Sequence, residues 1–213
     1  TPIYFFLSRK TAYRIPKNWA AGNLWLAEKI IGLRYTIEGL ENLPQGGYII
    51  SAKHQCFWDT FALIPTLDDP VYILKRELLW IPLFGWYAAK QKMIPINRAA
   101  KSRAIPEMVA RAKVELASGR ELIIYPEGTR KAPGETPDYK YGIARLYSDL
   151  KVPVVPIVMH PGLFWPRHGF LRFPGHVRIR ILKPIEPGMP PTDFFRHLVA
   201  YTEAASDALL LQT

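Results

Sequence analysis

Short apolar runs of strand length recur along most of the chain, separated by turn residues and by segments with helical spacing. Runs of this length bounded by turns are typical of buried strands. We predict strands at residues 35–39, 48–52, 71–74, 93–96, 121–126, 152–159 and 177–181. The last run alternates apolar residues with arginines, which is typical of a strand with one wetter face.

The clearest helix lies at residues 105–118, where apolar residues recur at helical spacing. Pro106 stands in its first turn and Gly119 stands just past its end, as helix termini favour. Another helix closes the chain, with Thr192 and Asp193 as its predicted N-terminal caps. Strands that alternate with helices predict an α/β fold with a largely parallel central sheet flanked by helices.

Residues 1–33 have a different pattern, in which aromatic and apolar residues are interspersed with single basic residues. We predict two short helices here, each with an aromatic face and a basic face, and such helices lie in a membrane interface. The alternative is a helical hairpin that packs on the core. We therefore divide the chain into a membrane-seating segment, residues 1–33, and an α/β domain, residues 34–213.

Residues 78–89 contain no charged residue but carry four aromatic ones, Trp80, Phe84, Trp86 and Tyr87. One interpretation is a core helix kinked at Pro82, because proline disrupts the interior of a helix. The other is an apolar surface that contacts an acyl chain or a bilayer. The sequence does not decide between the two.

The net charge of the chain restricts the classes of partner that it is expected to bind. The 213 residues carry a formal net charge of +10, with an isoelectric point near 9.7. So basic a protein is expected to meet an anionic partner: nucleic acid, a phosphorylated substrate or an acidic membrane surface. The single cysteine, Cys56, excludes an internal disulfide framework and a multi-cysteine zinc site.

The strongest candidate for chemistry is a histidine that follows the strand at 48–52. His54 stands just beyond this strand, and Asp59 follows five residues later. On one continuous helix the two side chains would point about 140° apart, so they can meet only if the chain turns between them. A strand end that feeds a helix is where open α/β sheets place their active sites. A neutral imidazole held by a buried carboxylate acts as a general base, although this spacing alone also occurs by chance.

Polar groups also follow three other predicted strands, and they are Lys75 with Arg76, Arg98, and Glu127 with Arg130. In a largely parallel sheet the carboxyl ends of the strands share one edge, so these groups can converge with His54 on one pocket. Such a pocket holds a base, its orienting carboxylate and several cations suited to a phosphate. Each cation taken alone is more typical of a solvated surface.

Four ordered blocks contain these residues: Lys53-His-Gln-Cys-Phe-Trp-Asp59, Lys75-Arg-Glu-Leu through to Ile94-Pro-Ile-Asn-Arg98, Tyr125-Pro-Glu-Gly-Thr-Arg130 and Val152-Pro-Val-Val-Pro156. In order and spacing the blocks resemble the glycerolipid acyltransferases with a His-x4-Asp motif, specifically the 1-acylglycerol-3-phosphate acyltransferases of the bacterial PlsC type. The resemblance covers residues 35–185. Asn97 stands where this family commonly has Asp, and Tyr125 where it commonly has Phe. Neither is expected to touch the proposed base or its partner.

The resemblance implies a mechanism. His54 takes the proton from the free sn-2 hydroxyl of lysophosphatidic acid, and Asp59 fixes the imidazole tautomer and stabilises the imidazolium. The hydroxyl oxygen attacks the thioester carbonyl of an acyl donor to give phosphatidic acid, so no covalent acyl-enzyme is needed. The resemblance places the acceptor's phosphate and glycerol against Lys75, Arg98, Glu127, Gly128, Thr129 and Arg130.

The same resemblance implies the partners of the chain. The donor is acyl-coenzyme A or acyl-acyl-carrier protein, and the reaction requires neither a metal nor a cofactor. The enzyme is expected to be peripheral on the cytoplasmic face of the bacterial inner membrane, against an anionic membrane surface. Nucleic acid is not an expected partner, because the sequence contains no nucleic-acid-binding motif.

Three other functions stay open at this point. The acceptor can be another lysolipid, such as lyso-ornithine lipid. Cys56 can act as a nucleophile with His54 as its base, which would make a thioesterase, but two residues apart on a turning chain is poor geometry for that pair. The chain can also be a non-catalytic basic–aromatic module that binds a membrane.

Overall fold

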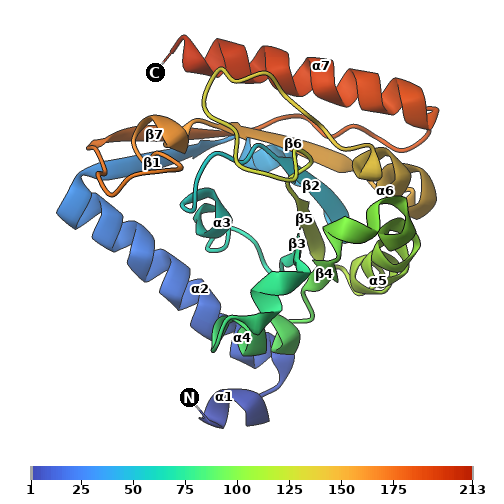
Figure 1. Cartoon of the computed structure of the whole chain (residues 1–213), viewed down its shortest axis with the longest axis horizontal. Coiled ribbons are helices and arrows are strands. Elements are labelled where there is room, and N and C mark those ends of the chain that lie inside the picture. The colour runs from blue at the N-terminus through green and yellow to red at the C-terminus, as the bar shows by residue number, and fades with distance from the viewer. Residues whose placement is uncertain (1, 213) are drawn as a thin grey trace.

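A seven-stranded sheet forms the centre of the molecule, in the order β1-β7-β6-β2-β5-β3-β4 (Figure 1). The computed structural model describes residues 2–212, except for the side chains of residues 2, 3, 98, 101 and 102. Its strands are β1 (Leu33–Glu38), β2 (Tyr48–Ala52), β3 (Val71–Lys75), β4 (Ile94–Ile96), β5 (Glu121–Ile124), β6 (Val154–Met159) and β7 (Gly175–Ile181). The pairings among these strands are parallel except for the one between β6 and β7. The predicted α/β fold with a largely parallel sheet is therefore confirmed.

The antiparallel pairing arises where the chain leaves β6. Residues 160–174 connect β6 to β7 without the long helix of a parallel crossover, and the chain returns beside β6 in the opposite direction. On the more exposed face of β7, Arg178 Nη2 lies 2.7 Å from Glu38 Oε1, and Arg180 Nε lies 3.0 Å from Glu38 Oε2. The alternation predicted for this strand is confirmed by its burial pattern.

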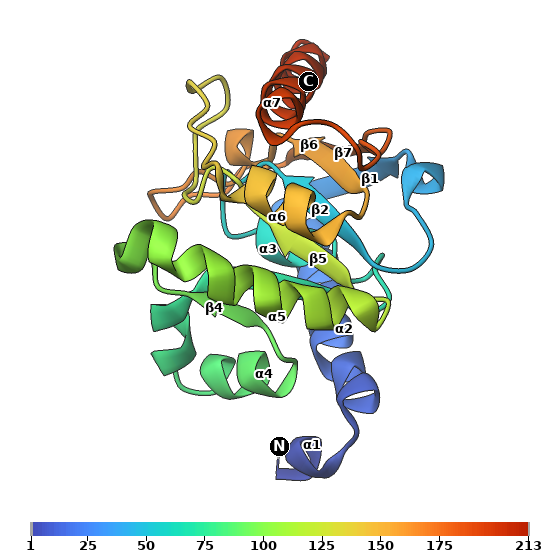
Figure 2. The same ribbon diagram turned by 90° about the vertical axis from the view of Figure 1, so that its right-hand side faces the viewer.

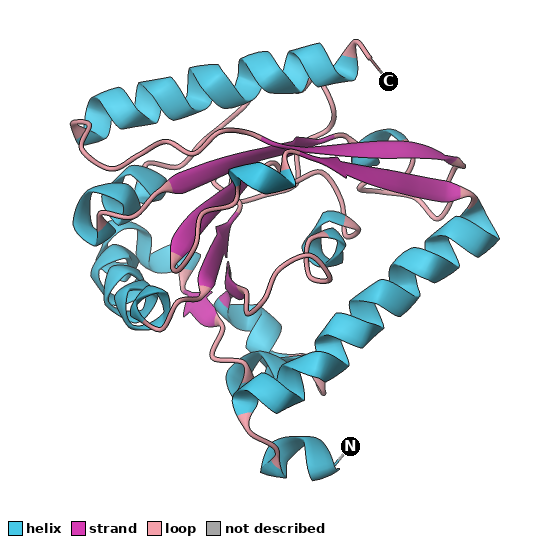
Figure 3. Ribbon diagram, turned by 180° about the vertical axis from the view of Figure 1, so that it is seen from behind, coloured by secondary structure: helices cyan, strands magenta, loops and turns pink. Residues whose placement is uncertain are grey.

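Helices cover both faces of the sheet (Figures 1 and 3). They are α1 (Pro2–Phe6), α2 (Arg9–Leu26), α3 (Asp59–Ala62), α4 (Phe84–Lys90), α5 (Ile105–Ala117), α6 (Gly142–Leu150) and α7 (Pro191–Leu210). Shorter helical turns are η1 (Ala27–Ile31), η2 (Leu40–Asn42), η3 (Arg76–Trp80), η4 (Arg98–Ala104) and η5 (Pro161–Leu163). One core cluster joins α2 and α3 to the sheet, and a second joins α5, α6 and α7 to it; Figure 2 looks onto α5 and α6.

The N-terminal segment differs from the two short helices expected there. α1 is short, but α2 runs for 18 residues and continues into the π-helical turn η1. The hydroxyl of Ser8 caps the start of α2 by accepting a hydrogen bond from Thr11 N at 3.2 Å. Gly32 ends η1 at a φ of +76°, where a glycine is favoured.

α2 presents two faces. Ala12, Ala20 and Leu24 are buried against the rest of the chain, whereas Trp19 and Trp25 are 49% and 57% exposed. The helix therefore packs on the core and also shows an aromatic surface, so it has features of both alternatives for this segment. Within residues 2–212, no helix has the length and apolar character needed to cross a membrane. The domain boundary at residue 33 stays a prediction.

The uncharged segment at 78–89 is not a core helix. It forms the end of η3 and most of α4, with Pro82 between them. Trp80, Leu83 and Trp86 are 73%, 55% and 57% exposed. The interpretation as a core helix is wrong, and the segment forms an exposed apolar surface.

The predicted caps of the closing helix are also wrong. α7 begins at Pro191, and Pro190 occupies the N-cap position without a side-chain hydrogen bond. Thr192 and Asp193 lie inside the first turn. The fixed φ of proline suits the first position of a helix, which moves the start of α7 upstream of both residues.

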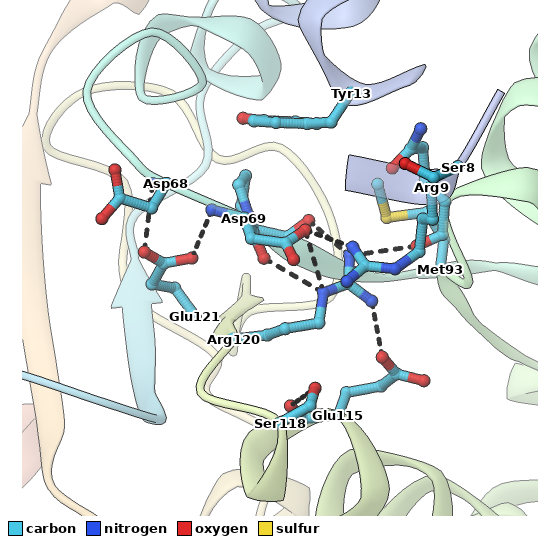
Figure 4. Close-up of polar contacts among 12 residues, drawn as sticks. Ser8, Arg9, Tyr13, Asp68, Asp69, Met93, Glu115, Ser118, Arg120 and Glu121 are labelled. Atoms are coloured by element: carbon cyan, nitrogen blue, oxygen red, sulfur yellow. Dashed lines mark hydrogen bonds and ion pairs between the residues drawn. The ribbon is translucent and has the colours of Figure 1, made fainter. Parts of the chain in front are cut away.

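A buried ion network joins the amino-terminal ends of β3 and β5 (Figure 4). Arg120 is 1% exposed, and its guanidinium lies 3.2 Å from Asp69 Oδ1 and 2.6 Å from Glu115 Oε2. Asp69 also pairs with Arg9 at the start of α2. The network thus ties the N-terminal helix to the sheet, at the edge opposite the strand end that leads to His54.

Candidate active site

The turn between β2 and α3 brings His54 and Asp59 together. β2 ends at Ala52 and α3 begins at Asp59, and between them His54 Nδ1 comes within 3.0 Å of Asp59 Oδ2. The Asp59 side chain is fully buried, while the His54 side chain is 17% exposed. One ring nitrogen therefore faces a carboxylate while part of the ring reaches solvent, which is the arrangement that a general base requires.

The loop between these residues holds the Asp59 carboxylate from several sides. Its Oδ2 accepts hydrogen bonds from the backbone N–H groups of Gln55 and Cys56, the latter at 3.1 Å. Its Oδ1 accepts from Cys56 Sγ at 3.0 Å. Because these donors replace water around a buried carboxylate, they also fix the plane in which it faces His54.

Cys56 is buried and points at Asp59. Burial, reinforced by the negative charge of that carboxylate, raises the pKa of the Cys56 thiol. A thiol with a raised pKa stays protonated at neutral pH, and this one donates a hydrogen bond to Asp59. The geometry therefore gives no support to Cys56 as a nucleophile.

Tyr125 stacks on the His54 ring, with ring centroids 4.2 Å apart and planes inclined by 24°. Its hydroxyl donates to the backbone carbonyl of Asp59 at 3.0 Å. The expectation that position 125 touches neither the base nor its partner is therefore wrong. The contact depends on β5 lying beside β2 in the sheet, which the sequence does not specify.

Glu127 turns inward from the end of β5 and is 1% exposed. The backbone N–H of His54 donates to Glu127 Oε2 at 3.4 Å, and Lys53 Nζ lies 3.5 Å from Glu127 Oε1. Burial raises the pKa of Glu127, and the positive charge of Lys53 opposes this rise. Glu127 thus supports the peptide that carries His54. Its contact with glycerol stays a prediction.

The turn after β5 presents Arg130 at the same edge of the sheet. Gly128 has a φ of +66°, and its N–H donates to the carbonyl of Tyr125 at 3.0 Å, so the chain reverses where other residues would be strained. Thr129 is exposed and Arg130 is partly exposed. In the part of the chain that the structure describes, no carboxylate pairs with the Arg130 guanidinium. Arg130 is therefore available to an anionic substrate.

Lys75 is the last residue of β3, and Arg98 follows shortly after the end of the neighbouring parallel strand β4. Both backbones therefore lie at the side of the sheet where β2 leads to His54. The Lys75 side chain is half exposed, and its Nζ lies 3.9 Å from Glu77 Oε1. The backbone of Arg98 begins η4, but its side chain lies outside the described residues. The sheet thus brings the predicted strand ends to one edge, while the contacts of these two cations with a substrate stay predictions.

Several residues around the site were not identified from the sequence as site residues, and they are Lys53, Gln55, Tyr125, His160 and Glu203. The one local signal is that His160 follows a strand, as His54 does. The others meet only through tertiary contacts. Among the described side chains, no group of His, Cys, Asp and Glu is arranged to hold a metal ion.

Comparisons with known proteins identify relatives of this chain. A family model described as "Acyltransferase" matches residues 34–160. The 1-acyl-sn-glycerol-3-phosphate acyltransferase of Pseudomonas aeruginosa is 35% identical over 181 residues, which cover 84% of this chain and 69% of that protein. The 1-acyl-sn-glycerol-3-phosphate acyltransferase alpha of Mus musculus is 29% identical over 196 residues, covering 86% of this chain and 69% of that protein.

A solved structure shares the fold. The crystal structure of the 1-acyl-sn-glycerophosphate (LPA) acyltransferase PlsC from Thermotoga maritima aligns with a TM-score of 0.77 at 21% sequence identity, over 94% of this chain and 81% of that chain. The likeness shows that the two proteins have the same α/β architecture. The family model and the relative that is 35% identical show that this chain belongs to the acyltransferase family.

Proposed function

We propose that the chain transfers a fatty acyl group from a thioester donor to the sn-2 hydroxyl of a 1-acyl-sn-glycerol 3-phosphate. The product is phosphatidic acid, used in phospholipid biosynthesis. The observation that carries the proposal is the His54–Asp59 pair, with 3.0 Å between Nδ1 and Oδ2. Relatives named 1-acyl-sn-glycerol-3-phosphate acyltransferases support the choice of acceptor.

The geometry of the pair determines the path of the proton. The Nδ1–H of His54 donates a hydrogen bond to Asp59, so the proton stays on Nδ1 and Nε2 carries the lone pair that receives the proton of the substrate hydroxyl. As the O–H bond breaks, the oxygen forms a bond to the thioester carbonyl carbon. The tetrahedral intermediate then collapses, the C–S bond breaks, and the imidazolium returns its proton to the leaving thiolate. The substrate's own hydroxyl is the nucleophile, so the buried Cys56 takes no part.

The acceptor's phosphate is bound by cations at the carboxyl edge of the sheet. Arg130 is the best placed of these, because it is partly exposed and free of carboxylate partners among the described residues. Its planar guanidinium can donate two parallel hydrogen bonds to a phosphate. Lys75 and Arg98 supply further positive charge from the next strands, and Gly128 and Thr129 shape the turn that presents Arg130.

The acyl donor is acyl-coenzyme A or acyl-acyl-carrier protein, since both offer the same thioester to His54. The donor is a co-substrate, and the proposed mechanism uses no further cofactor and no metal. The positive net charge of +10 suits both donors, because each carries phosphate groups or an acidic surface.

A peripheral position on an anionic membrane is supported by an aromatic surface that α1 and α4 share. The rings of Tyr4 and Tyr87 lie 4.4 Å apart and those of Phe5 and Trp86 lie 6.5 Å apart, so the two helices are in contact. Phe6 beside them is 89% exposed. Aromatic rings near basic residues suit the interface of an anionic bilayer, and the face proposed is the cytoplasmic one of the bacterial inner membrane.

The experiment is a thiol-release assay with acyl-coenzyme A and lysophosphatidic acid, with wild type beside His54→Ala. We expect acceptor-dependent release in the wild type and a loss of about 10²–10⁴-fold in the variant. His197→Ala is the matched control, because His197 is exposed on α7, and it should retain wild-type release.

The other outcomes separate the alternatives. Release without acceptor that survives in His54→Ala would mean a thioesterase with its centre elsewhere. Release with lyso-ornithine lipid alone would keep the reaction class and change the acceptor. Where acyl-coenzyme A gives no release, the assay is repeated with acyl-acyl-carrier protein. No thiol release with either donor overturns the proposal and favours a membrane-binding module.

A further inference from the structure

A buried chain of hydrogen bonds leads from the catalytic loop to α7. Gln55 Nε2 lies 3.0 Å from His160 Nδ1, and His160 Nε2 lies 2.8 Å from the backbone carbonyl of Ser206 on α7. Gln55 Oε1 accepts a hydrogen bond from Gly162 N at 3.1 Å. Gln55 is 2% exposed and His160 is 3% exposed, so water does not replace these partners.

The partners determine which atom is donor and which is acceptor in each of these hydrogen bonds. The Ser206 carbonyl can only accept, so His160 Nε2 carries the proton and donates it. In the neutral ring Nδ1 is then an acceptor, and Gln55 must present its amide N–H to it. The amide oxygen of Gln55 therefore points the other way, which is where the Gly162 N–H meets it. Burial lowers the pKa of His160, in agreement with this neutral tautomer.

Gln55 connects these hydrogen bonds to the catalytic pair. Its backbone N–H donates to Asp59 Oδ2, the same oxygen that faces His54 Nδ1. Because His160 and Gly162 hold both ends of the side-chain amide, residue 55 cannot rotate without breaking a buried hydrogen bond. The direction of its backbone N–H, and with it the position of the Asp59 carboxylate, is fixed in turn.

α7 holds the other neighbour of His54 as well. Glu203 lies one turn before Ser206 on α7, and both of its carboxylate oxygens lie 2.8 Å from Lys53 Nζ. The hydroxyl of Tyr139 donates to Glu203 Oε1 at 2.8 Å. Residues 53 and 55, on either side of His54, are thus both supported from one face of the same helix.

We propose that His160 is a positioning residue of the acyl transfer, which holds the His54–Asp59 loop in its reactive geometry through Gln55, with α7 as the support. The role rests on the proposed function, in which His54 is the base. His160 itself does not touch the substrate. It acts on the reaction because a carboxylate that shifts away from Nδ1 no longer orients the imidazole or stabilises the imidazolium.

Two substitutions at one position separate this role from a merely structural one. In His160→Asn, the amide oxygen can stand where Nδ1 stood and accept from Gln55, while the bond to Ser206 is lost. In His160→Gln, the amide N–H can reach the Ser206 carbonyl, while the acceptor for Gln55 is lost. Each variant removes one of two buried hydrogen bonds, so their melting temperatures should fall by similar amounts.

Their kinetics should differ. We expect His160→Gln to lower kcat by about tenfold to hundredfold, because small displacements of catalytic groups cost this much, and to leave KM for the acceptor unchanged. We expect His160→Asn to keep a kcat close to that of wild type. Asp59, Tyr125 and Glu127, which face His54 from the surrounding elements, are unchanged in both variants.

Each possible kinetic result either supports or overturns the role of His160. Equal losses of kcat in the two variants, or a wild-type kcat in His160→Gln, would overturn the role of the Gln55 branch. Gln55→Leu keeps the volume and removes both side-chain bonds. If either histidine variant fails to fold, Gln55→Leu takes its place and must itself lower kcat by about tenfold to hundredfold at unchanged KM, and a wild-type kcat in it would overturn the proposal. Full activity in His54→Ala would instead overturn the proposed function, and that result is independent of the comparison at position 160.

Discussion

At the scale of single residues, His160 is neutral in the folded protein because burial lowers the pKa of its imidazole. The hydrogen bond to the Ser206 carbonyl and the charges of Asp207 and Glu203 raise this pKa, whereas the positive charge of Lys53 lowers it further, and the net shift is downward. A second proton on the ring would also set Nδ1 as a donor against the N–H of Gln55. Protonation of His160 is therefore disfavoured in the fold and allowed in the unfolded chain.

The expected consequence is a loss of stability in acid. The unfolded chain binds a proton at His160 near the ordinary pKa of 6.5, and the folded chain binds it only at lower pH. The contribution to the unfolding free energy is fully present above about pH 6.5 and is lost as the pH falls through the folded pKa, by at most about 1.4 kcal/mol per pH unit. Urea unfolding at about pH 7.5, 6.5 and 5.5 should show this slope in wild type and not in His160→Asn.

The comparison of the two proteins isolates His160. Glu127 has a raised pKa, so its protonation in acid has the opposite effect and stabilises the fold as the pH falls through that pKa. This effect is common to wild type and His160→Asn and cancels in their difference. Identical slopes in the two proteins would contradict a buried neutral His160.

Residues differ in how far their roles can be predicted from the sequence. The meeting of His54 and Asp59 could be predicted from local sequence, because the pair follows a strand-length apolar run and a turn after that strand lets the two side chains touch. Tyr125 and Gln55 could not be predicted, because their contacts cross from one strand end to another. The sequence of a strand specifies which of its faces is buried, but not which strand lies beside it.

At the scale of elements, apolar runs located the strands well and short helices poorly. α6 was not predicted, although Ile143, Leu146 and Tyr147 have helical spacing and are buried. It follows directly on a loop without a capping side chain, so no local signal marks its start. The antiparallel β7 was not specified either, because its direction depends on how residues 160–174 return to β6.

The exposed aromatic surface of α4 leads to a prediction about membranes. Trp86 is 57% exposed and contacts Phe5 of α1, so its ring can enter the interface of a bilayer. Trp86→Ser should weaken binding to anionic vesicles by roughly tenfold, the equivalent of losing about 1.5 kcal/mol of apolar burial. Co-sedimentation with vesicles of phosphatidylglycerol measures this affinity.

The control is an equally exposed apolar residue on another surface. Val114 is 65% exposed on α5, and Val114→Ser should leave vesicle binding unchanged. Equal weakening by both variants would mean a general loss of apolar surface, and unchanged binding in Trp86→Ser would remove α4 from the membrane contact. Neither variant should lower the melting temperature much, because neither side chain belongs to a core cluster.

At the scale of the whole molecule, the carboxyl ends and the amino ends of the parallel strands carry different functions. His54 and Glu127 follow the carboxyl ends of β2 and β5, where loops can approach a substrate. Arg120 and Asp69 stand at the amino ends of β5 and β3, where a buried ion network ties in the start of α2 (Figure 4). Chemistry and anchoring of the N-terminal helix should therefore respond to different substitutions.

Arg120→Met tests this separation. The substitution leaves the carboxylates of Asp69 and Glu115 without their buried partner and removes the donors to the carbonyls of Pro70 and Gln91. Breaking a buried ion pair from one side costs about 3–5 kcal/mol, which urea unfolding measures. Arg111→Met is the matched control, since its pair with Glu107 is largely exposed and worth at most about 1 kcal/mol.

The activity of Arg120→Met gives the second half of the test. Below its unfolding temperature the variant should keep a wild-type kcat, because the network lies at the amino-terminal ends of β3 and β5, whereas the His54–Asp59 pair follows the carboxyl end of β2. A folded variant with a lowered kcat would show that the two edges are coupled through the strands. A lowered affinity for vesicles at unchanged kcat would instead mean that Arg9, released from Asp69, lets α2 shift on the sheet, and would place the network among the determinants of membrane binding.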